Sequence, residues 1–170
     1  MAKNRVRLAL VAALGLCSLG LSGCGFQPMY ATQADGSSVA LTLASIEIPE
    51  KQTRLEQLVR NALLNDIAPV GQAQTPRYRL DFTTSENQFD ISIEKNTDVN
   101  RRALTLIADY TLVDLSSNKS VLTGKTFSRV SYDRIQSEFA NIQAHRNALE
   151  RAAGEVADNI KIRLGGHFSK

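Results

Sequence analysis

Apolar residues recur at helical spacing in two stretches of the chain. The first covers residues 54–67 and follows Thr53 and Glu56, which have the spacing of a capping box. The second covers residues 139–164 and is rich in Ala, and the pair Gly165-Gly166 is expected to end it. We therefore predict one helix in the first half of the chain and a long helix near its end.

Strict alternation of apolar and polar residues predicts β-strands elsewhere. The clearest alternation covers residues 103–115, and residues 121–132 return after a turn. Residues 77–85 also alternate. The alternation resumes at Phe89 and Ile91, so that strand is expected to continue after an irregularity and to end in a polar hairpin loop over residues 94–100. The apolar run 39–48, which ends at Pro49, predicts the first strand.

The hairpin that joins the last two strands has a register that the sequence constrains. The even-numbered apolar face of residues 104–112 meets Leu122, Val130 and Tyr132 only if the loop has an odd number of residues. An even loop would place Lys125 or Arg129 opposite apolar partners. We therefore predict a loop of three or five residues.

These elements predict an α+β fold. Strand, helix, three strands and helix form a two-layer sandwich, in which a four-stranded sheet carries both helices on one face and buries their apolar stripes. The opposite face of the sheet is expected to be mostly wet, and it carries Thr105, Asp109, Thr111, Lys125 and Arg129.

The first 24 residues have the organisation of a secretory signal. Lys3, Arg5 and Arg7 precede the apolar residues 8–21, a run too short to span a bilayer as a helix. Leu-Ser-Gly-Cys then ends at Cys24 and resembles the lipobox of bacterial lipoproteins, which implies cleavage before Cys24 and acylation of its thiol. The alternative is an ordinary signal peptide with an incidental cysteine. We expect a signal peptide (1–23), a lipidated tether (24–38) and a single α+β domain (39–170).

Charge and motifs exclude several classes of function. Three of the 20 Lys and Arg residues lie in the expected signal peptide, together with none of the 17 acidic residues. The remaining chain is therefore formally neutral, which argues against a nucleic-acid partner. His145 and His167 have no nucleophile or metal-ligand cluster at recognisable spacing. We expect no catalytic residue, no metal and no cofactor.

Four basic residues near the predicted strands are candidates for phosphate binding. They are Arg101, Arg102, Lys125 and Arg129. Arginine pairs with phosphate oxygens in a bidentate manner, and Ile107 and Phe127 nearby offer contacts for acyl chains. The alternative is a solvated sheet face on which these cations pair with neighbours such as Asp109.

Residues 23–30, Gly-Cys-Gly-Phe-Gln-Pro-Met-Tyr, resemble the start of the lipopolysaccharide-assembly lipoproteins of the LptE family. The length, the element order and the late Ala-rich helix with Arg146, Asn147 and Ala148 agree with this resemblance. It implies a lipid-anchored protein on the periplasmic side of the outer membrane, and Gly25 fits, because an Asp there would favour the inner membrane. It also implies that the protein plugs the LptD β-barrel, helps it assemble and binds lipopolysaccharide.

Two other functions compete with this hypothesis. One is a lipoprotein that scaffolds another cell-envelope complex, which copurification with a large barrel would distinguish. The other is a small periplasmic hydrolase, for which the sequence offers no polar catalytic cluster. Loss of an activity on mutation of His145 or His167 would support the hydrolase.

Overall fold

The structure is a computed structural model that describes residues 38–69, 71–73, 75–91 and 100–169. The signal peptide, Cys24 and nearly all of the tether lie outside the described residues, as does the predicted hairpin loop except for Asn100. The elements are, in order, α2 (Val39–Ala44), β1 (Ile46–Glu47), α3 (Arg54–Ile67), β2 (Tyr78–Ile91), β3 (Asn100–Asp114), β4 (Lys119–Arg134) and α4 (Glu138–Phe168).

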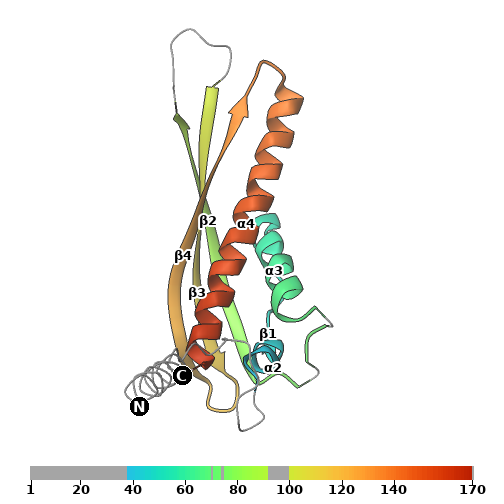
Figure 1. The fold of residues 1–170 in the computed structure, drawn as a ribbon, viewed down its shortest axis with the longest axis vertical. Helices are drawn as coiled ribbons and strands as arrows, with labels where there is room; N and C mark the ends of the chain where they lie inside the picture. Colours follow the sequence, from blue (N-terminus) through green and yellow to red (C-terminus); the bar gives the residue numbers. More distant parts are fainter. Residues whose placement is uncertain (1–37, 70, 74, 92–99, 170) are drawn as a thin grey trace, which may run out of the picture.

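The four strands form one open, mixed sheet in the order β1-β2-β3-β4. β1 runs parallel to β2, whereas β2, β3 and β4 are antiparallel to one another. The long helix α4 lies along one face of the sheet, with α3 beside it (Figure 1). The predicted α+β fold, with a four-stranded sheet and both long helices on one face, is confirmed.

The core lies between the helices and the even-numbered residues of the sheet. Small residues on α4 allow this close packing, since Ala148, Ala152, Ala153 and Ala157 are all fully buried. Leu80, Leu106 and Leu112 of the sheet are also completely buried. Close packing of this kind, rather than any disulfide, stabilises the described domain.

Helix α3 begins and ends where its sequence predicts. The Thr53 hydroxyl accepts a hydrogen bond from the Glu56 amide at 3.2 Å and donates one to the Glu56 carboxylate at 3.0 Å. Val59, Leu63 and Ile67 on its apolar stripe are buried. Arg60, on the polar side, donates to the carbonyl oxygens of Ile48 and Pro49 and so holds the preceding loop against the helix.

The strand predicted over residues 39–48 is wrong in its first part. Val39–Ala44 form the short helix α2, capped by Ser38, and only Ile46–Glu47 pair with the sheet. A short apolar run is compatible with either a strand or a buried helical turn. Here Val39 and Leu43 are buried on the same side of one helical turn. Tertiary packing therefore decides between the two structures.

The end predicted for the long helix is also wrong. α4 continues through Gly165 and Gly166 to Phe168. Gly165 is buried, and the Phe168 ring packs on Tyr78 with 5.0 Å between the ring centroids. That contact stabilises the last turn despite the two glycines. At the other end of the helix, Ile142, one of the apolar residues at helical spacing within residues 139–164, is 44% exposed rather than buried.

The β3–β4 hairpin has the predicted facing residues but not the predicted loop length. Leu112 pairs with Leu122 and Leu104 with Val130, as expected. The loop nevertheless has four residues, because Asp114 pairs with Lys119, and Val121 is an extra residue between the Ser120 and Leu122 pairs. This β-bulge restores the register that an even loop would otherwise shift.

Strand β2 contains no irregularity. It pairs with β3 at every residue from Tyr78 to Ile91, in a single register. The apolar residues nevertheless change face along it: Tyr78, Leu80 and Phe82 lie toward the helices, whereas Phe89 and Ile91 lie on the open face.

Within the described ranges, no helix is long and apolar enough to cross a membrane.

Candidate functional site

The open face of the sheet has an exposed apolar region that extends from the middle of β3 and β4 to the end of β2. The register places Phe89 and Ile91 of β2, Ile107 of β3 and Phe127 of β4 on this face. Phe89 is 44% exposed and Phe127 is 62% exposed. Apolar side chains grouped on a sheet face that no described helix covers indicate a surface for binding another molecule.

Arg129 lies within this region and reaches across the central strand. Its Nε donates to the Thr105 hydroxyl of β3 at 3.3 Å, and its guanidinium lies 5.4 Å from the centroid of the Phe89 ring of β2. Thr105 and Ala103, on the same face, are buried. Thr105, which we expected to be exposed to solvent, is therefore shielded from it.

The other three candidate cations pair with aspartates. Arg101 contacts Asp133 at 2.9 Å, Arg102 contacts Asp90 at 2.6 Å, and Lys125 contacts Asp109 at 3.4 Å. Among the described residues, Arg129 has no carboxylate within ion-pair distance. A guanidinium has five N–H donors, and the described residues engage only its Nε–H, on Thr105. Arg129 is therefore the candidate best placed to bind a phosphate oxygen.

Arg101 and Arg102 do not form one site. Because successive side chains of a strand point to opposite faces, Arg101 lies on the open face with Lys125 and Arg129, while Arg102 faces helix α4. The structure thus brings three of the four predicted residues to one face.

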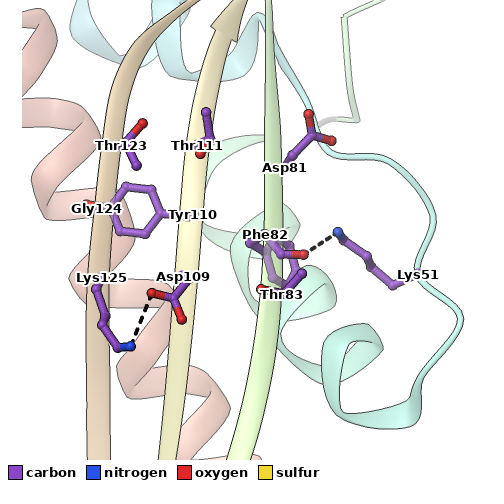
Figure 2. Close-up of a pocket in the computed structure, with 10 residues that line it drawn as sticks. All are labelled: Lys51, Asp81, Phe82, Thr83, Asp109, Tyr110, Thr111, Thr123, Gly124 and Lys125. Atoms are coloured by element: carbon purple, nitrogen blue, oxygen red, sulfur yellow. Dashed lines mark hydrogen bonds and ion pairs between the residues drawn. The ribbon is translucent and has the colours of Figure 1, made fainter.

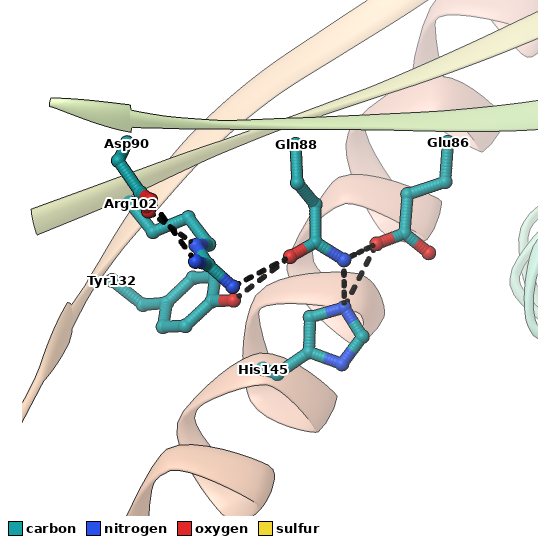
Figure 3. A network of polar contacts seen from close by, with 6 residues as sticks. All are labelled: Glu86, Gln88, Asp90, Arg102, Tyr132 and His145. Carbon is teal, nitrogen blue, oxygen red and sulfur yellow. Dashed lines mark hydrogen bonds and ion pairs between the residues drawn. The ribbon is translucent and has the colours of Figure 1, made fainter.

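Arg102 belongs to a polar network between the sheet and α4 (Figure 3). It donates two hydrogen bonds to Asp90, and Gln88 accepts a hydrogen bond from the Tyr132 hydroxyl at 3.2 Å. The Nε2 atom of His145 lies 2.8 Å from the Glu86 carboxylate and 3.0 Å from the Gln88 amide. The network joins three residues of β2 to one residue each of β3, β4 and α4.

Electrostatics within these pairs follow from the hydrogen bonds. The bond from Arg102 lowers the pKa of Asp90, and the bond to Asp90 raises the pKa of Arg102. The bond from Arg101 likewise lowers the pKa of Asp133. Both aspartates are exposed, so these pairs neutralise charge more than they stabilise the fold.

The lower part of the open face has a hollow of about 610 Å³, lined by polar residues together with the rings of Phe82 and Tyr110 (Figure 2). Its floor consists of short polar side chains, among them Thr83, Thr111 and Thr123, with Asp109 and Lys125 paired beside them. Lys51 closes one side, donating to the Phe82 carbonyl oxygen at 2.6 Å. No group of three or more His, Cys, Asp and Glu side chains that could hold a metal ion occurs in the part of the chain that the structure describes.

Comparison with known proteins identifies the family. The model of the LptE lipopolysaccharide-assembly family matches residues 39–164. This chain belongs to the LptE family. Its fold is similar to the crystal structure of a lipoprotein from Caulobacter crescentus CB15, with a TM-score of 0.66, 27% identity and coverage of 77% of this chain and 95% of that one. The uncharacterized protein RP188 of Rickettsia prowazekii (strain Madrid E) is 26% identical over 156 residues, which cover 90% of this chain and 93% of that protein.

For this LptE-family chain, sequence analysis missed the network around His145. Glu86, Gln88 and Asp90 continue the even-numbered face that begins with Tyr78, so an uninterrupted strand would have placed all three toward α4. The pairing of His145 with them required the position of the helix, which the local sequence does not give.

Proposed function

We propose that this chain is an outer-membrane lipoprotein, acylated at Cys24 and exposed to the periplasm, that plugs an LptD-like β-barrel. In this role it helps the barrel to assemble and assists the insertion of lipopolysaccharide into the outer leaflet. Membership of the LptE family supports the assembly role, and the lipobox-like sequence before Cys24 supports the anchor. A mostly polar lower sheet face suits the polar interior of a large barrel.

The observation that carries the lipopolysaccharide part is the environment of Arg129. A cation without a carboxylate partner among the described residues lies on a phenylalanine ring, beside the exposed ring of Phe127. Lipopolysaccharide combines phosphate groups with acyl chains, so one such region can bind both parts. Arg101, Arg102 and Lys125 remain proposed contributors, but each must first leave an aspartate.

Substitution of Arg129 tests this site directly. We expect Arg129→Ala to weaken lipopolysaccharide binding by the purified full chain roughly tenfold, because a charged hydrogen bond contributes about 1.5–3 kcal/mol. Arg54→Ala is the matched control, since it removes an exposed arginine from helix α3, outside this face. Equal binding by both variants would remove Arg129 from the site.

Crosslinking in intact cells tests the surface and the partner separately. A photoreactive residue at Phe127 is expected to capture lipopolysaccharide, whereas one at Asn61 on α3 is not.

Purification of the full chain in detergent is expected to recover a large outer-membrane barrel. A clean preparation without any barrel would contradict the plug and favour a scaffold of another envelope complex.

A further inference from the structure

An apolar hollow lies beside helix α2, at the opposite end of the sheet from Phe89 and Ile91. It has a volume of about 450 Å³ and lies between α2, the end of α3 and the last part of α4. Its lining is mostly aliphatic, with one lysine at the side, and includes Ala40, Leu41, Ala44, Ile67, Pro69 and Lys161. The proposed lipopolysaccharide site does not include these residues.

Helix α2 holds an apolar side chain out at the edge of this hollow. Val39 and Leu43 are 3% and 2% exposed and fix the helix to the core, whereas Leu41, between them, is 70% exposed. The six residues of α2 include no charged side chain. An uncharged helix that projects a leucine next to an apolar hollow is costly to leave in water.

The chain enters the described domain at this hollow. Ser38 caps α2, and the next residues, Ala40 and Leu41, line the hollow. Thirteen residues lie between Cys24 and Ser38, and even when fully extended the fourteen steps from one to the other span at most about 50 Å. α4 has 31 residues and is about 46 Å long. A membrane that holds Cys24 can therefore easily contact α2. It could contact the far end of the domain only if the tether were almost fully extended.

We propose that the hollow beside α2 docks on the lipid surface of the membrane that holds Cys24, with Leu41 inserted among the acyl chains. This inference rests on the proposed acylation of Cys24. Lys161 lines the hollow with its aliphatic stem and is suited to place its ammonium group at the lipid phosphates. This docked state is that of the chain outside the barrel, in which the domain stands on its α2 end and points the first turn of α4 away from that bilayer (Figure 1).

Asp66 is the carboxylate in the lining, and its surroundings are compatible with docking. Burial is the main cause that raises its pKa, with Asp158 adding to the effect and Lys161 opposing it. Lys161 of α4 thus partly offsets the charge of Asp66. The two carboxylates outnumber this lysine, so insertion depends on the apolar residues rather than on attraction to anionic lipid.

The test uses the full lipidated chain in vesicles of phosphatidylethanolamine and phosphatidylglycerol. An environment-sensitive fluorophore is attached at Leu41→Cys, and at Phe139→Cys in a matched second protein. Both positions are highly exposed, at 70% and 73%, and α2 and the start of α4 lie at opposite ends of the domain (Figure 1). Nitroxide-labelled phospholipid and aqueous iodide serve as quenchers. We expect the lipid to quench the probe at position 41 and iodide to quench the probe at position 139.

The outcomes separate this inference from the lipid anchor. Vesicles that float with the protein, but with the position-41 probe quenched only by iodide, would overturn docking and leave the anchor intact. A position-41 probe that neither quencher reaches would mean that another part of the protein covers the hollow, which also overturns docking. A protein that does not float with vesicles would overturn both. Adding Lys161→Ala is expected to reduce the lipid quenching at position 41 without abolishing it.

Discussion

The two halves of the sheet differ in the side chains that they present on each face. In the half near α2, the face toward the helices is apolar, with Leu80, Phe82 and Leu112 buried, while the open face carries mainly Thr, Asp and Lys residues around a hollow. In the other half, the open face carries Phe89 and Phe127, and the face toward α4 carries the network around Arg102 and His145.

This difference separates stability from binding. Hydrophobic burial is the dominant favourable term in folding, and in the half near α2 it is directed inward, against α3 and α4. In the other half, Leu104 and Leu106 are still buried, but polar contacts join the sheet to α4 beside them and further apolar side chains lie on the open face. We therefore expect substitutions in the two halves to have different consequences: loss of stability in the first, and loss of binding in the second.

Truncation of Leu112 is expected to have the largest effect. Leu112 is completely buried, and removal of such a side chain leaves a cavity that costs about 2–5 kcal/mol. Leu112→Ala should lower the free energy of unfolding by that amount in urea denaturation. Phe127→Ala, on the open face of the other half, should lower it much less and reduce lipopolysaccharide binding instead. Equal losses of stability in the two variants would contradict the difference proposed between the two halves of the sheet.

A methyl group at Gly124 should have the next largest effect. It would lie 2.6 Å from Cζ of Tyr110, whose ring lies across this glycine in the half near α2. Tyr110 is only 3% exposed and has little room to move, so Gly124→Ala should cost about 1–3 kcal/mol. The loss should appear as a lower midpoint in urea denaturation.

Gly154→Ala in α4 is the control for Gly124. A methyl group there meets no atom within 4 Å, and alanine favours a helix over glycine by about 1 kcal/mol. The same alanine substitution should thus stabilise the helix and destabilise the sheet. A stabilised Gly124→Ala protein would show that the Tyr110 ring moves freely.

The smallest expected effects are opposite pH dependences at the two ends. The folded pKa of Asp90 lies below its ordinary value of 3.8 because of Arg102, so its contribution is present at neutral pH and is lost as the pH falls through that folded pKa. Asp66 has a folded pKa above 3.8, mainly through burial, so it weakens the fold as the pH rises through that raised pKa. Asp90→Asn should slightly lower the melting temperature at pH 7, and Asp66→Asn should raise it.

Comparison of each variant with the parent protein at acidic pH provides the control. Below pH 3.8 both aspartates become protonated in the unfolded chain, so the difference that each substitution makes should shrink there. A difference in melting temperature that does not change with pH would show that the substitution acts through packing rather than through charge.

The sequence alone determined the features that depend on neighbouring residues. The cap at Thr53 and the apolar stripe after it fixed both ends of α3, because the hydrogen bonds of a helix are local. Alternation along β3 determined which residues from Ala103 onward share a face, whereas the opposite faces of Arg101 and Arg102 follow from the extension of the strand to Asn100 in the structure. The residues before Cys24 suggested the lipid anchor on which the proposed function rests.

Only the tertiary structure decided features that depend on distant partners. Packing made residues 39–44 a helix. The Phe168 ring lies on Tyr78 where α4 continues past two glycines. A bulge at Val121 restored the strand register that a loop with an even number of residues would have shifted. Three of the four candidate cations have aspartates opposite them, and Arg129 has none among the described residues. These outcomes follow from which side chains meet across strands and helices, and that depends on long-range contacts that local patterns do not encode.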